Sequence, residues 1–263
     1  MVKKINNGII VSMVVHDNIN LEHNHMYRQL SHSLNTLRKL NNSIAVKIYY
    51  SHKPGLPENH SVYFPEDLNT EFISFENNIS LDWHPEFWSA ELVEHRWINA
   101  FRGLEDFNFD NIINMDTDTE FYIDPEELFK KYGNTEFLWS REDTSDNITK
   151  ILKIYPGIND GLTIISKNIL DHKDICLLSM KEYINETLRE YKSIFSEKDY
   201  HHLPWIIVQY SLFNYFNKKN IHRYFSKEDV LLHCEERKDT HVVRHYFSGN
   251  SSQFLPKWLG GTQ

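Results

Sequence analysis

Two aspartates one residue apart, Asp116 and Asp118, follow an apolar run at residues 112–115 and are well placed to do chemistry. Carboxylates at that spacing repel each other, so we expect solvent, a basic partner, a divalent cation or a phosphoryl group to compensate them. Side chains two residues apart in an extended strand point the same way, so both carboxylates can address one ion. Mg²⁺ and Mn²⁺ take carboxylate ligands of this kind together with phosphate oxygens. The pair therefore predicts a metal site at the end of a strand.

Two other interpretations of the pair stay open. A solvated turn after a strand produces the same short pattern. An apolar run followed by Asp-Thr-Asp-Thr also matches the first motif of haloacid-dehalogenase-like phosphatases, in which the first aspartate, here Asp116, is the nucleophile. Those phosphatases need a late acidic metal motif, but none of the nine glycines is followed by Asp and no Asp-Asp pair occurs. The later part of the chain therefore argues against the phosphatase.

Composition and charge narrow the class of protein and of partner. The chain has 263 residues, of which 40% are hydrophobic and 25% charged, as in a globular protein that buries a substantial core. The formal net charge of -9 argues against nucleic acid or anionic lipid as the main partner, because either would favour a basic surface. To bind an anionic ligand, this negatively charged protein would therefore need local cationic side chains or a metal ion.

The cysteines and the first residues indicate a compartment. Cys176 and Cys234 are the two cysteines, and two provide no disulfide framework, so a reducing compartment fits best. The apolar segment that follows the polar residues 1–7 is too short for a signal peptide or a membrane span. The sequence therefore predicts a soluble, cytoplasmic protein with no membrane span.

Apolar patterning predicts strands that alternate with helices. We expect strands at residues 8–15, 45–50, 71–75, 111–115, 136–140 and 162–166, and helices at 24–40, 86–107, 178–195 and 204–217, with a short helix beginning at Asp124-Pro125. This alternation is typical of an α/β domain with a mainly parallel sheet, in which ligands bind at the carboxyl ends of strands. Asp17 and Asn18 follow the first strand, so we expect them to share a cleft with the aspartate pair.

These residues, in this order, resemble the GT-A-fold glycosyltransferases, and most specifically glycosyltransferase family 8, the glycogenin and lipopolysaccharide galactosyltransferase group. The matching pieces are Arg96, Met115-Asp116-Thr117-Asp118-Thr119, Asp124-Pro125-Glu126-Glu127-Leu128-Phe129, Asn159-Asp160-Gly161, His245-Tyr246-Phe247-Ser248-Gly249 and Pro256-Lys257-Trp258. The resemblance implies an α/β GT-A fold with a single Rossmann-like mixed sheet flanked by helices. It implies one domain over residues 1–263, with a nucleotide-binding part at 8–120 and an acceptor- and metal-completing part at 121–258.

The resemblance also implies an activity. It implies a metal-dependent enzyme that moves a sugar from a nucleotide-diphosphate donor, a UDP-sugar, to a glycan or other hydroxyl acceptor, with retention of the anomeric configuration. His245 would be the third ligand of a Mn²⁺ or Mg²⁺ ion beside Asp116 and Asp118, and an imidazole ligand favours Mn²⁺. The resemblance assigns no catalytic residue here.

Further contacts follow from the same resemblance. It places Asp17, Asn18, Thr117, Gly249 and Lys257 at the nucleotide and its diphosphate, and Arg96, Asp143, Asn159, Asp160 and Gly161 at the donor sugar, with Asp160 also near an acceptor hydroxyl. A guanidinium offers a fork of donors for phosphates or hydroxyls, and glycine lets the backbone approach a ligand. A surface lysine, an exposed loop acid and a plain turn are the alternatives for Lys257, Asp143 and residues 159–161.

Two departures from the family pattern keep a non-catalytic relative open as an alternative. The spacing from His245 to Lys257 is longer than in the family, and Pro256-Lys257 reverses its Lys-Pro order. The family's Asp-Gln pair is missing from the region that here holds residues 201–205. That pair supports the retaining mechanism in the family. Its absence is therefore also expected of a relative that binds nucleotide sugars or glycans without turnover.

Overall fold

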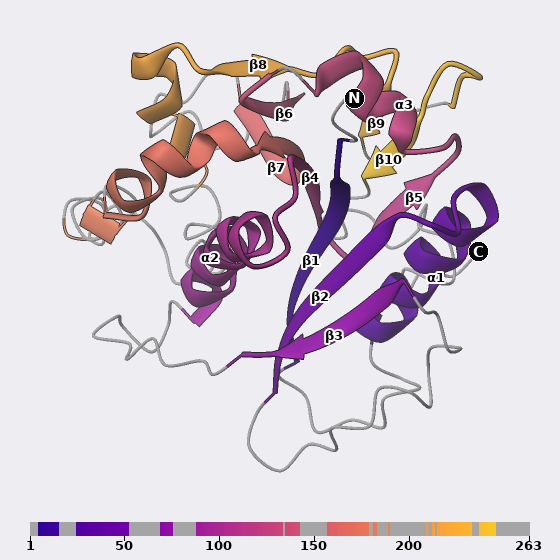
Figure 1. The fold of residues 1–263 in the computed structure, drawn as a ribbon, viewed down its shortest axis with the longest axis horizontal. Coiled ribbons are helices and arrows are strands. Elements are labelled where there is room, and N and C mark those ends of the chain that lie inside the picture. The colour runs from indigo at the N-terminus through magenta and orange to yellow at the C-terminus, as the bar shows by residue number, and fades with distance from the viewer. Residues whose placement is uncertain are drawn as a thin grey trace.

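The fold is an α/β arrangement built on a mixed sheet, which confirms the predicted fold class (Figure 1). The computed structural model describes residues 5–15, 25–52, 69–75, 88–133, 135–142, 157–178, 181–182, 189, 209, 212–213, 215–232 and 237–245. The strands of the large sheet are β1 (Asn7–Val15), β2 (Ala45–His52), β3 (Thr70–Ser74), β4 (Asn111–Met115), β6 (Phe137–Glu142), β7 (Gly157–Ser166) and β8 (His222–Tyr224). Their order across the sheet is β3-β2-β1-β4-β7-β6-β8.

The direction of the strands divides this sheet into two parts. Strands β3, β2, β1 and β4 run parallel to one another, as the alternation of strands and helices predicts. Strand β7 runs antiparallel to both β4 and β6. The carboxyl ends of β1 and β4 therefore lie at one edge, and β7 enters beside β4 from the opposite direction.

Helices cover the two faces of the sheet. The helix α1 (His25–Leu40) lies on one side of strands β1 to β3 and α2 (Trp88–Asp106) lies on the other (Figure 1). The apolar stripe of α1, which includes Leu30, Leu34 and Leu37, is buried against one face, and Trp97 and Phe101 of α2 are buried against the other. Because neighbouring residues of a strand point to opposite faces, β4 contributes to both cores and all five of its residues are buried.

The sequence predicted the strands and helices with long apolar patterns closely. The predicted strand at 111–115 coincides with β4, and the predicted helix at 24–40 differs from α1 by one residue. The short helix α3 (Glu126–Tyr132) begins after Pro125, and Asp124 accepts a hydrogen bond from the backbone N–H of Glu126 at 3.0 Å. A 3₁₀ helix, η4 (Lys167–His172), follows β7. The predicted helices at 178–195 and 204–217 lie largely outside the described residues.

A second, smaller sheet was not predicted. Its strands are β5 (Thr119–Phe121), β9 (Val230–Leu232) and β10 (Val243–His245), in the order β5-β10-β9. Each has three residues, which is too short to show a recognisable hydrophobic period. Strand β10 pairs antiparallel with β5 in a register that sets His245 opposite Thr119. This pairing brings the carboxyl-terminal part of the chain to the residues that follow β4.

No helix in the part of the chain that the structure describes combines the length and the apolar character needed to cross a membrane.

Candidate metal centre

The aspartate pair lies in a tight connection between the two sheets. Asp116 directly follows β4, and residues 117–118 form a turn into β5. The hydroxyl of Thr119 donates to the carbonyl of Asp116 at 2.9 Å and closes this turn. The two carboxylates therefore converge through a turn, not along an extended strand as the spacing alone suggested.

Helix α1 holds the turn from its buried side. The hydroxyl of Ser33 lies 2.6 Å from the carbonyl of Thr117 and also contacts the carbonyl of Thr119. The hydroxyl of Thr117 donates to the side-chain carbonyl of Gln29 at 2.9 Å, so this side chain is turned toward α1. The sequence reasoning missed Gln29 and Ser33. Their signal was available, because they are two polar residues, four positions apart, next to the apolar stripe of α1.

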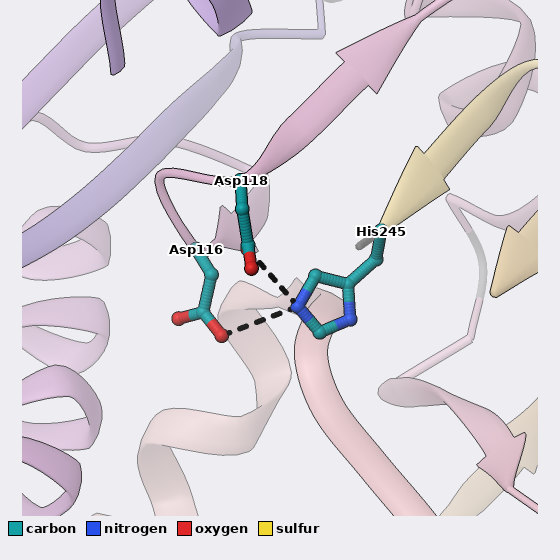
Figure 2. Close-up of side chains that lie close together, drawn as sticks. All are labelled: Asp116, Asp118 and His245. Carbon is teal, nitrogen blue, oxygen red and sulfur yellow. Dashed lines mark ion pairs between the residues drawn. The ribbon is translucent and has the colours of Figure 1, made fainter. Parts of the chain in front are cut away.

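His245 completes a cluster with both aspartates (Figure 2). Its Nε2 lies 3.3 Å from Oδ1 of Asp118 and 3.4 Å from Oδ2 of Asp116. One ligand atom from each of the three side chains lies within 4.8 Å of the others, which is a spacing that could hold a metal ion. The structure therefore brings together the three residues that the sequence predicted as metal ligands.

The donor set and the burial of this cluster suit a divalent cation. Two carboxylates and an imidazole match the ligand preferences of Mn²⁺ better than those of Mg²⁺. Asp118 and His245 are almost completely buried, and the buried Oδ1 of Asp118 is directed at Nε2 of His245 at 3.3 Å. A buried carboxylate is costly unless cationic charge compensates it, and a metal ion shared by the three side chains would supply that charge. The residues present therefore fit a bound metal ion.

Gly161 leaves room for the imidazole. A Cβ atom at this position would lie 1.8 Å from Cε1 and 2.2 Å from Nε2 of His245. The backbone carbonyl of Gly161 accepts from the N–H of Asp116 at 2.8 Å, and its own N–H donates to the side chain of Asn159 at 2.9 Å. Gly161, which the sequence placed at the donor sugar, therefore borders the cluster directly, and Asn159 holds its backbone.

Arg96 connects the cluster to α2. Its Nη1 lies 3.2 Å from Oδ1 of Asp116 and 3.3 Å from Oδ1 of Asp160, and its Nη2 donates to the backbone carbonyl of Asp160. Arg96 is only 3% exposed and Asp160 only 1%. Trp97, the next residue of α2, is buried in the core. The predicted site residues Asp17, Asn18, Asp143, Gly249 and Lys257 lie outside the described residues.

The charges of the cluster shift the pKa values in opposite directions. Burial disfavours the ionised form of Asp116, but Arg96 and His245 outweigh it and lower its pKa. Burial raises the pKa of Asp118 in spite of His245, and it raises the pKa of Asp160 in spite of Arg96. For His245, burial is outweighed by Asp118 and Asp116, which raise the pKa of the imidazole to about 10.

The raised pKa of His245 predicts that metal binding releases a proton. In the metal-free protein the imidazole is protonated well above its ordinary pKa of 6.5, and a metal ion binds only the neutral ring. We expect the Mn²⁺ affinity to rise about tenfold per pH unit between about pH 6.5 and 8, because one proton leaves per ion bound. Calorimetry in buffers of different ionisation enthalpy measures this release directly.

The matched control for this prediction is His245→Gln. This variant keeps a polar side chain but has no imidazole proton to lose, so its residual Mn²⁺ binding should show less proton release. A Mn²⁺ affinity of the parent protein that does not change over this pH range would contradict the prediction.

Comparison with known proteins shows the fold. No protein-family model and no curated protein matches the sequence. Among solved structures, mouse xyloside xylosyltransferase 1 in its apo form matches with a TM-score of 0.55 at 10% identity, over 95% of this chain and 99% of that chain. The galactosyltransferase LgtC in complex with donor and acceptor sugar analogs matches with a TM-score of 0.54 at 14% identity, over 93% and 88%.

A third similar structure is the glycosyltransferase GlyE in Streptococcus pneumoniae TIGR4. It matches with a TM-score of 0.55 at 12% identity and covers 94% of this chain but 56% of that chain. All three proteins are glycosyltransferases, and similarity at these low identities is a similarity of fold. The resemblance noted in the sequence is therefore confirmed at the level of architecture: this chain has the GT-A fold of these glycosyltransferases.

Proposed function

We propose that this chain is a metal-dependent glycosyltransferase that moves a sugar from a UDP-linked donor to a hydroxyl group of a glycan or another acceptor. The observation that carries the proposal is the convergence of Asp116, Asp118 and His245 on one point at the end of β4. Ligands of open α/β sheets bind at such carboxyl ends. The GT-A fold supports this activity, although a fold by itself does not determine a function.

Each residue has a stated part in this proposal. Asp116, Asp118 and His245 hold a Mn²⁺ or Mg²⁺ ion, which supplies Lewis-acid neutralisation of the charge on a departing nucleoside diphosphate. Asn159 and Gly161 border the donor sugar beside the cluster. We extend the proposal to a single domain over 1–263, with the nucleotide bound by residues 8–120 and the acceptor side formed by 121–258.

The surroundings of Asp116 favour a transferase over the phosphatase alternative. Its Oδ1 faces Arg96, and its Oδ2 is directed at the imidazole of His245. A nucleophilic carboxylate needs an oxygen directed at the phosphorus atom of its substrate. The geometry therefore suits a residue that holds a cation better than a residue that attacks a phosphoryl group.

Calorimetry with a panel of UDP-sugars, with and without Mn²⁺, tests the proposed function. We expect binding that requires the metal ion, followed by turnover when an acceptor is present. Metal-dependent binding without turnover on any acceptor would favour the non-catalytic relative. No nucleotide binding, together with hydrolysis of a generic phosphate ester, would favour the phosphatase.

The proposed stereochemical outcome is retention of the donor's anomeric configuration. This part rests on the resemblance to family 8 alone. NMR of the first-formed product determines the anomer, and an inverted product would remove the likeness to family 8 without affecting the GT-A fold.

A further inference from the structure

Asp160 is a buried carboxylate whose side chain is bound by two residues of α2. Its Oδ1 lies 3.3 Å from Nη1 of Arg96, and its Oδ2 accepts a hydrogen bond from Nε1 of Trp97 at 3.2 Å. Its backbone carbonyl accepts from Nη2 of Arg96. Two consecutive residues of α2 therefore bind three oxygens of Asp160, and this residue in turn restricts the guanidinium of Arg96.

Arg96 passes this restraint on to the metal centre. The nitrogen that contacts Asp160, Nη1, is also the one that lies 3.2 Å from Oδ1 of Asp116. Arg96 is buried, so its guanidinium is surrounded by protein and not by solvent. With Oδ1 of Asp116 held by Arg96, its Oδ2 is the oxygen directed toward His245.

An irregularity in β7 directs Asp160 toward α2. Ile164 and Leu162 pack in the core on the α1 side of the sheet, so regular alternation would send the side chain of residue 160 to that side as well. The pairing of β6 with β7 shifts register at this point: Trp139 pairs with Thr163, but Ser140 pairs with Asn159. Such a bulge changes the face to which a side chain points. Asp160 is thereby directed to Arg96 and Trp97.

We propose that Asp160 is a positioning residue: through Arg96 it holds Asp116 in the orientation that leaves one carboxylate oxygen for a cation shared with Asp118 and His245. The proposal rests on the proposed metal centre but goes beyond it, because Asp160 itself belongs to no ligand set. It also gives Asp160 a role that differs from the sugar or acceptor contact expected from the sequence.

The proposal predicts that Asp160→Asn weakens Mn²⁺ binding although no ligand is changed. Arg96 and Trp97 donate to different oxygens of the carboxylate, so an amide in the same orientation would set its oxygen against one of these donors and its NH₂ group against the other. Arg96 would lose its fixed position and Asp116 its orientation. Changes to groups that orient metal ligands lower affinity by about 10–100-fold, and we expect a loss in that range, measured by calorimetry with Mn²⁺ alone.

A double-mutant cycle tests whether Asp160 acts through Arg96. Arg96→Met removes the guanidinium but keeps an apolar side chain of similar length. If Asp160 acts through Arg96, the double variant Arg96→Met/Asp160→Asn should bind Mn²⁺ no more weakly than Arg96→Met alone. Losses that add in the double variant would overturn the proposal, because Asp160 would then act on the centre independently of Arg96.

Asp229→Asn is a matched control for the loss of a buried, paired carboxylate. Asp229 is 8% exposed and accepts from Nζ of Lys131 at 2.7 Å and from the hydroxyl of Tyr132. We expect this variant to lose thermal stability but to keep the Mn²⁺ affinity of the parent. A comparable loss of Mn²⁺ affinity in both variants would assign the effect of Asp160→Asn to general destabilisation and would overturn the proposal.

Trp97→Phe is a second variant that tests the proposal if Asp160→Asn does not fold. It removes one donor to Asp160 and keeps the carboxylate, Arg96 and an aromatic ring, so Mn²⁺ binding should weaken by less than in Asp160→Asn. If the parent protein binds no Mn²⁺, the proposed metal centre and this proposal both fail. If the parent binds Mn²⁺ and none of these variants changes the affinity, this proposal fails and the metal centre stands.

Discussion

Asp118→Asn is expected to lower Mn²⁺-dependent UDP binding by more than about 100-fold while the protein remains folded, since even changes to groups that only orient ligands cost about 10–100-fold. Asp118 is one of three predicted ligands, and an amide contributes no negative charge to a cation. Calorimetric titration of UDP in the presence of Mn²⁺ measures the loss.

The metal-free protein should tolerate this change well. Burial raises the pKa of Asp118, so the folded protein disfavours its charged form when no cation is bound. Against this, its Oδ1 lies 3.3 Å from Nε2 of His245 and raises the pKa of that imidazole, so the substitution also removes an ion pair. Because these two effects oppose each other, we expect a melting temperature close to that of the parent protein in the presence of a chelator.

Glu120→Gln is the matched control for Asp118→Asn. Glu120 is two residues further along the chain, and its Oε1 lies 3.2 Å from Nε2 of His32, away from the cluster. Neutralising it removes one negative charge from β5, which directly follows the turn, so UDP binding should stay close to that of the parent. A fully retained affinity in Asp118→Asn, or an equal loss in Glu120→Gln, would refute the metal role of Asp118.

Gly161→Ala adds a single methyl group, and we expect it to lower Mn²⁺ affinity about as much as Asp118→Asn lowers Mn²⁺-dependent UDP binding. The new Cβ would overlap the imidazole of His245, whose ring is rigid and buried, so the ring must leave its position between the two aspartates. Displacement of a ligand should cost more than about 100-fold in Mn²⁺ affinity, above the cost of changing a group that only orients one. Overpacking should also lower the free energy of unfolding by about 1–3 kcal/mol.

Gly103→Ala separates crowding in general from displacement of His245. Its Cβ would lie 2.4 Å from Cδ1 of Ile10, which also crowds the core beneath α2. This variant should leave Mn²⁺ affinity unchanged. In a His245→Ala background, Gly161→Ala should no longer destabilise the protein, because the ring that it overlaps is gone. Normal Mn²⁺ binding by Gly161→Ala would show that the imidazole lies elsewhere when metal is bound.

The sequence alone predicted the elements that carry a long, regular pattern. A continuous apolar run ended by two carboxylates placed β4 at residues 111–115 and the aspartate pair directly after it. The spacing of leucines predicted α1 within one residue, because a helix that covers a sheet must keep one face apolar over its whole length. Local patterning was enough for these elements because each residue's environment repeats with the period of its own element.

The resemblance to family 8 named His245 as the third ligand, but only the tertiary structure gave the pairing that brings it to the two aspartates. His245 is one of 15 histidines, and no pattern around it in the sequence indicates the short strand β10. Its place beside Asp118 comes from the pairing of β10 with β5, which joins segments far apart in the chain. Three-residue strands are stabilised by such long-range pairing and not by a local preference, so their register cannot be read from the residues themselves.

The sequence indicated that Gly161 and Asp160 lie near a ligand, but the fold decided how each contributes. Gly161 is required because the ring of His245 occupies the space of a side chain, and that contact exists only after both sheets have formed. Asp160 points to Arg96 because the pairing of β6 with β7 shifts by a bulge, which alternation along a strand does not predict. Residue type and order thus determined which groups were available for the site. Strand register and the bulge determined which atoms face one another. The sequence alone could not give these two features, because each depends on pairing with strands distant in the chain.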